Sequence, residues 1–183
     1  MNIFVLDTDI DKCARYHCDK HLVKMITEHN QILGSIAYTA NGIMKKKDIC
    51  PSFVKQWFVD FPRRHEDGSS NPYGIGYANH PCTKWAAESA SNYEWLASLN
   101  LAMCKEYTAR YRRRHAGESI TEWYHSNMPT LKKVGMTPFA QAMPDDVKNS
   151  NAVVAYRNYY KKYKNDIAKW AHSEKPDWWR SSV

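Results

Sequence analysis

The sequence predicts an all-α fold with one domain over residues 1–183, and three observations lead to this expectation. Apolar residues such as Trp85, Leu96 and Leu99 recur at helical spacings. Residues 3–6 form a short strand-like run, but no second strand is apparent with which it could pair. The length allows a real core, and the 43% of hydrophobic residues exclude an intrinsically disordered chain.

The first elements follow from the order of apolar and capping residues. Residues 1–6 are expected to form a short extended arm, which ends at the cluster Asp7-Thr8-Asp9. Short side chains with an acceptor oxygen are frequent caps at the beginning of a helix. The following helix is predicted over residues 11–46, with an interruption near Gly34 or near Asn41-Gly42, because glycine is unfavourable inside a helix.

Later elements follow from periodicity and from the positions of proline and glycine. Helices are predicted over residues 83–114, 118–127 and 151–172. Residues 49–80 and 129–146 are expected to form long irregular segments, because proline and glycine interrupt them. Segments of this length in a compact domain usually have a function or contain short helices.

The composition excludes several classes of protein. The five cysteines are odd in number and form no Cys-x-x-Cys pair, which argues against a disulfide framework and a zinc ribbon. No apolar run approaches the roughly 18 residues of a membrane span, and residues 1–6 lack the features of a signal peptide. We therefore expect a protein of the reducing cytoplasm without a membrane partner.

The charge balance bears on the partner. The 26 lysines and arginines outnumber the 19 acidic residues, which gives a formal net charge of +7. An excess of positive charge favours a polyanionic partner, nucleic acid first. The alternative is an ordinary basic protein, because a modest positive charge is common in proteins that bind no nucleic acid.

Four titratable residues form a row on the first predicted helix. At 100° per residue, His17, His21, Lys24 and Glu28 fall within a sector of about 60°. Such neighbours suit proton transfer, because each shifts the pKa of the next towards neutrality. One alternative is a solvated helix face with a Lys24–Glu28 ion pair. Another is a metal site that adds Glu28 or His80 to the two histidines. A His-Glu-x-x-His motif is absent and Lys24 would repel a cation, so no metal is expected.

The last predicted helix carries an aromatic and basic run. Residues 155–164 read AYRNYYKKYK, in which Arg157 and Lys161 are interleaved with Tyr159 and Tyr160. Cations neutralise phosphates and phenol rings stack on bases, so these four residues are candidates for nucleic-acid binding. The tyrosines also have the spacing of a core stripe, and both interpretations hold if tyrosines face inward and lysines outward.

Further candidates lie beside the predicted loops. Arg112 and Arg113 end the middle helix, where their charges suit either a nucleic acid or the helix dipole. Asn79 and His80 precede a proline, and the extended backbone expected there would direct them towards a substrate, although a turn that starts the next helix also explains them. Gln141 lies in an apolar loop, where its amide would read a base edge or bond the backbone.

The order of these features resembles the phage pyrimidine-dimer DNA glycosylases, the small UV-endonuclease family. An apolar N-terminal arm leads into a helix with the motif His-Leu-x5-Glu, here His21-Leu22 and Glu28. A middle helix around residues 93–111 and a Tyr-rich basic run around residues 159–161 are similar to the family's second helix and C-terminal segment.

The resemblance implies an all-α enzyme that flips a base out of duplex DNA. It attacks C1′ of the damaged nucleotide with an N-terminal α-amine, here that of Met1, and the resulting imine permits strand cleavage by β-elimination. An α-amine suits this step because its ordinary pKa, about 7.7–8.0, leaves a neutral fraction at pH 7. Glu28 would be the catalytic carboxylate, with His21 beside the site and His17 in the same row. No cofactor is implied.

Several positions differ from the family. Its nucleophile is a small residue exposed by removal of methionine, whereas Asn2 follows Met1 here. Its arginines just before and three residues after the glutamate correspond to Thr27 and Gln31. Lys24 is a candidate for substrate binding and, like Lys20, a substitute for the α-amine.

Three hypotheses follow from the sequence. The first is a DNA N-glycosylase, with or without abasic-site lyase activity, that acts as a monomer on duplex DNA with a damaged or modified base. Its expected location is the cytoplasm, or the host cytoplasm for a phage-encoded protein. The second is an enzyme that acts on a free nucleoside or nucleotide, which the absence of the flanking arginines favours. The third is a non-catalytic, helical nucleic-acid-binding module.

Overall fold

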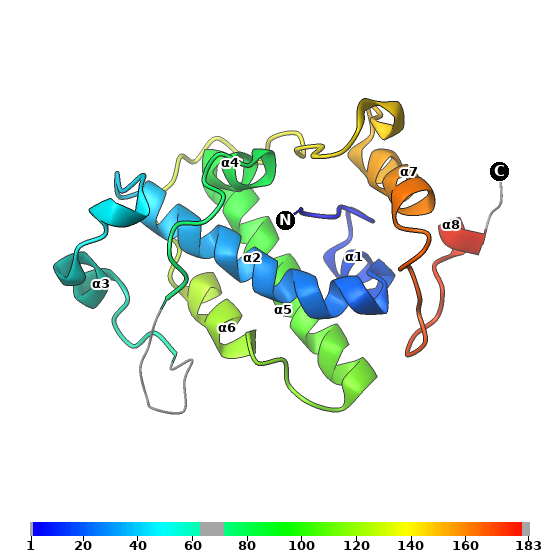
Figure 1. Ribbon diagram of the computed structural model, residues 1–183, viewed down its shortest axis with the longest axis horizontal. Helices are drawn as coiled ribbons and strands as arrows, with labels where there is room; N and C mark the ends of the chain where they lie inside the picture. The colour runs from blue at the N-terminus through cyan, green and yellow to red at the C-terminus, as the bar shows by residue number, and fades with distance from the viewer. Residues whose placement is uncertain (1, 63–71, 181–183) are drawn as a thin grey trace.

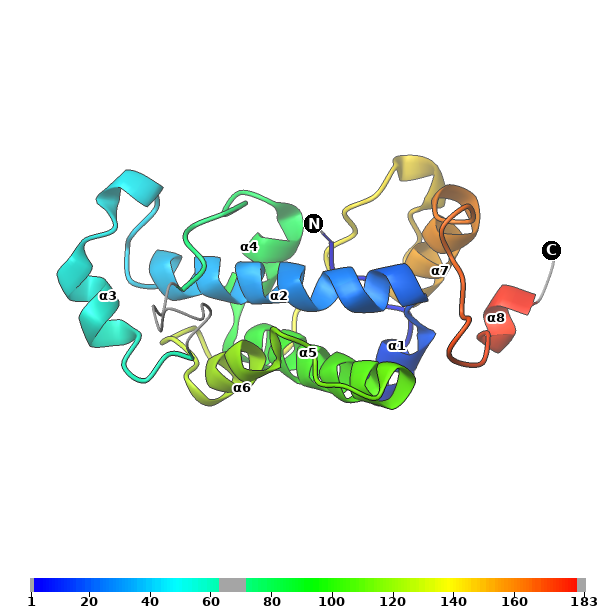
Figure 2. The same ribbon diagram turned by 60° about the horizontal axis from the view of Figure 1, so that its bottom comes forward.

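Two long helices cross at the centre of the computed structural model, which describes residues 2–62 and 72–180 (Figures 1 and 2). They are α2 (Asp19–Thr39) and α5 (Ala90–Tyr111). The other helices are α1 (Ile10–Tyr16), α3 (Pro51–Trp57), α4 (Pro81–Glu88), α6 (Glu118–Ser126), α7 (Ala152–Tyr163) and α8 (Asp177–Arg180). Short 3-10 turns lie at Lys46–Asp48 and Asp145–Val147. The described residues contain no strand, which confirms the predicted all-α fold.

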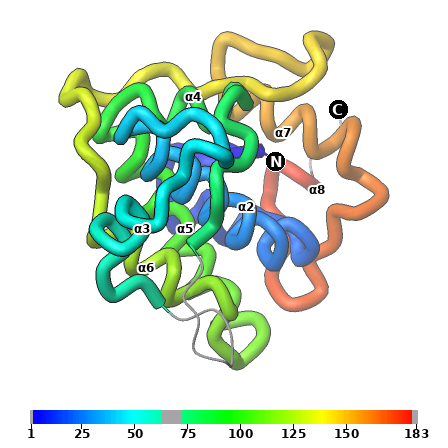
Figure 3. The backbone as a smooth tube through the Cα atoms, turned by 60° about the vertical axis from the view of Figure 1, so that its left-hand side comes forward, coloured from blue at the N-terminus to red at the C-terminus, as the bar shows by residue number. Residues whose placement is uncertain are grey.

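The remaining elements surround this central pair. Helices α1, α4 and α6 pack against α5, and α4 and α6 also contact α2. Figure 3 shows α3 and α6 on one side of α2, and α7 with the C-terminal segment on the other. The middle of α2 therefore lies between these two groups of elements.

The predicted N-terminal arm lies in the interior, and all of residues 2–6 are buried. The Phe4 ring stacks on His21 of α2 with centroids 4.5 Å apart, and it meets the edge of Tyr160 of α7 at 5.2 Å. The arm thus fills the space between α2 and α7 (Figure 1). Asp9 caps α1 by accepting a backbone N–H hydrogen bond at 2.8 Å, as its position predicts.

The first predicted helix is in fact two helices, and the interruption expected at Gly34 is wrong. Extended backbone at His17 and Cys18, with ψ values of 130° and 159°, separates α1 from α2. Gly34 lies inside α2, where a Cβ atom would stand 2.7 Å from the Tyr124 hydroxyl oxygen. The lack of a Cβ atom at this position lets α6 approach α2 closely, and the glycine does not break the helix. The predicted turn at Asn41-Gly42 does follow the end of α2.

Two later boundaries also differ from expectation. The predicted helix over residues 83–114 is divided at Ser89, whose extended backbone and side-chain oxygen cap α5. The short helix predicted over residues 118–127 is confirmed as α6. Asn151 caps α7, and α7 ends at Tyr163 and not at residue 172.

The segment after α7 runs along the beginning of α2 instead of continuing as a helix. Trp170 Nε1 donates a hydrogen bond to the Tyr16 carbonyl at 3.2 Å. The Asp19 backbone N–H donates to the carbonyl of Lys169 at 2.8 Å, and its carboxylate accepts from Ala171 N at 2.6 Å. These hydrogen bonds join residues 169–171 to the junction between α1 and α2. The contact between distant parts of the chain overrides the helical pattern of residues 164–172.

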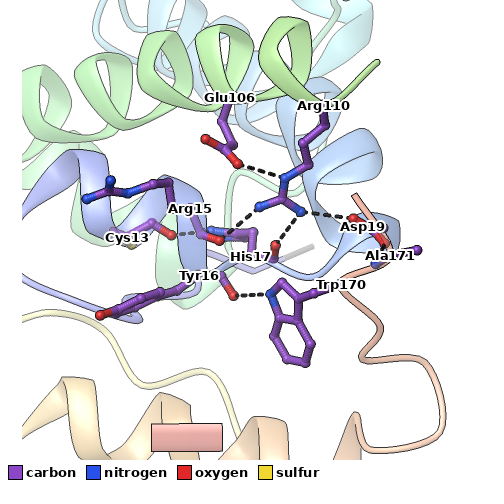
Figure 4. A network of polar contacts seen from close by, with 9 residues as sticks. All are labelled: Cys13, Arg15, Tyr16, His17, Asp19, Glu106, Arg110, Trp170 and Ala171. Carbon is purple, nitrogen blue, oxygen red and sulfur yellow. Dashed lines mark hydrogen bonds and ion pairs between the residues drawn. The ribbon is translucent and has the colours of Figure 1, made fainter. Parts of the chain in front are cut away.

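A buried ionic network holds the same junction (Figure 4). The side chain of Arg110 is 1% exposed, and it donates to the carboxylates of Asp19 at 3.0 Å and Glu106 at 2.7 Å. Its remaining N–H groups donate to the backbone carbonyls of Arg15 and His17, at 2.8 and 3.0 Å. A cation from α5 thus satisfies the carbonyls that the break between α1 and α2 leaves without helical partners.

The long irregular segments are partly confirmed. Residues 129–144 have no regular helix, whereas residues 49–80 contain α3, and residues 63–71 of that segment lie outside the described part. All five cysteines are free, as expected, and Cys50 alone among them is exposed. None of the helices in the described ranges is long and apolar enough to cross a membrane.

Candidate active site

Glu28 lies in the middle of α2 and is paired with a cation one turn before it. Lys24 Nζ stands 3.0 Å from Glu28 Oε1, and the two side chains are 69% and 13% exposed. Partial burial acts to raise the pKa of the Glu28 carboxyl, but the hydrogen bond of Lys24 and the positive charges of the terminal amine and of Lys24 together outweigh it, and the pKa is lowered. The carboxyl is therefore ionised at neutral pH although it is largely withdrawn from water.

The first described residue of the arm is held rigidly near this helix. Asn2 is 7% exposed, and its side-chain N–H donates to the Ala142 carbonyl at 2.9 Å. Its Oδ1 accepts from the Cys82 thiol at 3.3 Å and from the Tyr156 hydroxyl at 3.0 Å. The end of the arm is thus fixed by α4, α7 and the segment between α6 and α7. Met1 lies outside the described residues.

His80 borders the same region from the beginning of α4. Its Nδ1 accepts the backbone N–H of Cys82 at 3.2 Å and caps the helix, as a helix-starting turn requires. Burial lowers the pKa of His80, while the negative charge of Glu28 acts to raise it, so the two side chains share one electrostatic environment. Because Nδ1 accepts, the proton of the neutral ring is on Nε2, where it can be donated to a ligand.

His21 faces the interior of the protein and not the side of α2 that carries Lys24 and Glu28. It is 6% exposed, and its Nδ1 stands 2.5 Å from the Tyr160 hydroxyl. Burial lowers its pKa to about 4, with further contributions from Lys164 and Lys24. His21 is therefore neutral at pH 7 and joins α2 to α7 beside Glu28.

The expectation that His17 belongs to the row is wrong, because it lies in the break before α2. Its side chain is fully buried, and Nδ1 donates to the Cys13 carbonyl at 2.8 Å. Burial keeps its pKa well below the ordinary value. The predicted row of four is thus reduced to Lys24 and Glu28 on the accessible face, with His21 turned inward.

Two of the predicted nucleic-acid contacts are engaged inside the protein. Tyr160 is fully buried against His21. Arg157 donates to the Leu6 carbonyl at 2.9 Å and to the Asp7 carboxylate at 3.0 Å. Tyr160 therefore faces the core, as the core interpretation of the tyrosine spacing predicts, while Arg157 fastens the arm to α7.

Other predicted contacts remain at the surface. Arg112 and Arg113 are exposed at the end of α5, and Tyr159 and Lys161 are partly exposed on α7. The Tyr159 ring receives the Lys164 ammonium at 5.0 Å, which places a cation and an aromatic side by side on this helix.

The two loop amides have different environments. Gln141 bonds the backbone of Asn149 with both ends of its amide, at 2.6 and 3.1 Å, which favours the backbone interpretation over base reading. Asn79 is exposed and lines a cavity of about 700 Å³ between α4, the end of α2 and residues 131–140. Asn79 is therefore available to a ligand, whereas Gln141 is occupied.

A buried polar cluster behind Glu28 was not predicted. His29 Nδ1 donates to Asn100 Oδ1 at 3.1 Å, and Asn100 Nδ2 donates to Asn30 Oδ1 at 3.1 Å and to Thr121 Oγ1 at 3.0 Å. The cluster fixes the segment of α2 around Glu28 against α5 and α6. The asparagine within the apolar stretch of residues 96–103 is the signal that could have indicated it, because a buried amide needs partners.

The helical fold, the buried arm and the cation-paired carboxylate together define the class of small helical DNA glycosylases that the sequence resembles. The chain matches the family model of the pyrimidine dimer DNA glycosylases over residues 1–119, and it belongs to that family. Membership implies a DNA N-glycosylase and abasic-site lyase that acts on UV-damaged DNA, which confirms the activity that the first hypothesis predicts. Comparisons with curated proteins and with solved structures find no match.

The extent of the match separates the chain into two parts. It includes the arm, helices α1 to α5 and the first residues of α6, so Glu28 and His80 both lie within it. Helix α7, which holds the arm in place, lies beyond it.

Proposed function

We propose that Glu28 is the catalytic carboxylate of this glycosylase and that the amine at the end of the arm is its nucleophile. The observation that carries the proposal is the ionised, largely buried state of Glu28 beside Lys24 and in the electrostatic range of His80. The anchoring of Asn2 supports it, because a nucleophile must be positioned before it reacts.

The chemistry follows from these groups. The neutral amine attacks C1′ of the damaged nucleotide, the bond from C1′ to the base breaks, and the base keeps the bonding electrons, takes up a proton and stays attached to its neighbour through the dimer. The amine nitrogen loses its protons as the sugar ring opens and an imine forms. The Glu28 carboxylate stabilises the positive charge at C1′ and accepts a proton. Removal of a C2′ proton then expels the 3′ phosphate, and water releases the protein from the imine.

The surrounding side chains suit substrate binding. Lys24 reaches into solvent and can contact a phosphate, while His80 Nε2 and the Asn79 amide offer donors to the sugar or the base. We assign DNA-backbone contacts to the exposed Arg112 and Arg113 and to Tyr159 and Lys161. Cations of this kind supply the salt-dependent part of the affinity.

The chain is proposed to act as one domain and as a monomer. Elements from the whole sequence share the core around α2 and α5, and the arm is held by residues 140 or more positions away. Light scattering of the protein with and without DNA measures the number of copies directly.

Borohydride trapping on a duplex with one pyrimidine dimer tests the proposal. We expect a covalent adduct whose mass maps to the amino-terminal peptide, and we expect Glu28→Gln to lower cleavage of the N-glycosidic bond about 10²- to 10⁴-fold with DNA binding retained. Glu122→Gln on α6, where the side chain is 51% exposed, is the matched control and should keep the wild-type rate.

Three results would contradict it. An adduct at Lys24 or Lys20 would move the nucleophile from the arm to α2. An undiminished rate in Glu28→Gln would remove the carboxylate from the mechanism. Base release from a free nucleotide but not from the duplex would favour the small-molecule hypothesis.

A further inference from the structure

Tyr156 of α7 is a fully buried tyrosine whose hydroxyl meets the N-terminal arm. The hydroxyl oxygen stands 3.0 Å from Asn2 Oδ1 and 2.7 Å from the Ala140 carbonyl oxygen, and it donates its proton to this pair of acceptors. Burial raises the pKa of the phenol well above its ordinary value, so the hydroxyl keeps its proton at neutral pH. The hydroxyl therefore connects the arm to the segment between α6 and α7.

The amide of Asn2 is held by groups from several parts of the chain. Besides the Tyr156 hydroxyl, Asn2 Oδ1 accepts from the Ile3 N–H at 2.9 Å and from the Cys82 thiol at 3.3 Å. Its Nδ2 donates to the Ala142 carbonyl at 2.9 Å. An amide oxygen has two lone pairs, so these donors saturate it. The amide is thus fixed in one orientation, and the backbone of the arm is fixed with it.

The anchored end of the arm lies beside the proposed catalytic carboxylate. Figures 1 and 2 show the arm running along α2 in the opposite direction, with its beginning next to the middle of that helix. Phe4 stacks on His21, and the chain before Phe4 continues from there towards Glu28, which follows His21 by about 10 Å of helix. Burial lowers the pKa of His29, the residue after Glu28, to about 4, and the neighbouring Asn2 backbone acts to raise it.

The terminal amine is in the electrostatic range of both the carboxylate and the partners of the Asn2 amide. Burial raises the pKa of the Cys82 thiol to about 11, and the positive charge of the amine acts against this rise. The same charge contributes to the lowered pKa of Glu28, against the effect of partial burial. Because Cys82 also donates to Asn2, the groups that hold the amide and the group that would react belong to one site.

We propose that Tyr156 is a positioning residue for the nucleophile, because its hydroxyl holds the Asn2 amide and, through it, the amine at the end of the arm beside Glu28. The inference rests on the proposed function, since it requires that this amine reacts. A displacement of about 1 Å of a reacting group costs about 100-fold in rate. Tyr156 lies beyond residues 1–119, so this support comes from the part of the chain outside the family match.

Tyr93 on α5 offers a matched control. It is also buried, and its hydroxyl donates to the Tyr124 carbonyl at 3.0 Å, which joins α5 to α6 and does not involve the arm. Tyr93→Phe and Tyr156→Phe therefore each remove one buried phenol hydroxyl and keep the ring. Both variants should lose a similar amount of stability, whereas only Tyr156→Phe should slow the reaction of the amine.

The experiment measures the rate of the amine separately from the amount of folded protein. Borohydride trapping is followed over time with DNA in saturating excess, on a duplex with one pyrimidine dimer and on a duplex with one abasic site. Each protein molecule is trapped once, so the final amount of adduct counts the active protein and the rate constant reports the position of the amine. Both substrates are used because the same amine attacks C1′ in each.

Tyr156→Phe should lower the rate constant about 10- to 100-fold on both substrates, while the final amount of adduct and the affinity for DNA stay at the wild-type level. Tyr93→Phe should keep the wild-type rate constant. Asn2→Leu, which keeps a large residue after Met1, should slow the reaction to a similar extent as Tyr156→Phe. In the double variant the two losses should not add, because without the amide the hydroxyl has nothing in the arm to hold.

The outcomes are separable from those of the proposed function. A wild-type rate constant in Tyr156→Phe, with or without a smaller final amount of adduct, would overturn the positioning role. Equal slowing by Tyr93→Phe, or losses that add in the double variant, would overturn it as well. Absence of an amino-terminal adduct from the wild type would instead overturn the proposed function.

Discussion

Two ion-pair clusters on α2 use the same kinds of side chain for different purposes. At the start of the helix, Arg110 is 1% exposed and donates to two carboxylates and two backbone carbonyls. At its middle, Lys24 is 69% exposed and pairs with Glu28, which is 13% exposed. In the first cluster the cation and its two carboxylates are largely withdrawn from water, and their contacts stabilise the fold. The second leaves its cation in water and keeps a carboxylate ionised at the surface of a site.

The difference shows that burial of the cation, and not the presence of an ion pair, separates the two roles. Removal of a fully buried guanidinium whose donors are satisfied lowers the free energy of unfolding strongly, because its carboxylate and carbonyl partners stay buried without a cation or water to bond. An exposed ammonium contributes little to stability, but it still sets the charge state of the carboxylate beside it. Three variants test this contrast.

The largest effect on stability is expected from Arg110→Met. Removal of the guanidinium leaves the carboxylates of Asp19 and Glu106 partly buried without their cation, which should lower the free energy of unfolding by about 3–5 kcal/mol. Urea denaturation measures it. Arg114→Met is the matched control, because the Arg114 side chain is 63% exposed and its removal should change the free energy of unfolding little. Equal losses in the two variants would contradict the distinction.

An intermediate effect is expected from acid. Burial lowers the pKa values of His21 and His29 to about 4, whereas the same side chains titrate near 6.5 in an unfolded chain. Between these values the unfolded state binds more protons, so the free energy of unfolding falls as the pH is lowered from about 6.5 to about 4. Denaturation at a series of pH values should show this slope, and His21→Gln should reduce it. An unchanged slope in the variant would refute the assignment.

The smallest effect on stability is expected from Lys24→Met, at less than about 1 kcal/mol. The hydrogen bond and charge of Lys24 lower the pKa of Glu28, so their loss should raise that pKa. In the proposed mechanism the ionised carboxyl supports cleavage of the N-glycosidic bond, so the acid limb of the cleavage rate should move to higher pH. Lys148→Met, which removes an exposed pair with Asp145, is the control that should leave the pH profile in place. The same profile in both variants would argue against a catalytic Glu28.

Local patterns in the sequence predicted those features that depend on local spacing. The cap at Asp9, the short helix α6 and the Lys24–Glu28 pair all follow from residues within a few positions of each other. The motif that places Glu28 after His21 added the family resemblance, and the family assignment confirmed it.

Features that depend on distant partners could not be predicted in this way. The break at residues 17–18 is held by Arg110, more than 90 positions later, and it removes His17 from the row. Tyr160 approaches His21 across 139 positions, which turns both residues inward. The left-handed backbone of Tyr77, with a φ of +58°, is equally hidden, because residue identity does not specify a positive φ for a tyrosine.

The anchoring of Asn2 has a consequence for the order in which the protein matures. Two of the groups that hold Asn2, the Ala142 carbonyl and the Tyr156 hydroxyl, are synthesised 140 and 154 residues after it. At about 5–20 residues per second, Asn2 spends several seconds without these partners. The ordering of this end of the arm is thus coupled to the synthesis of residues 142–156.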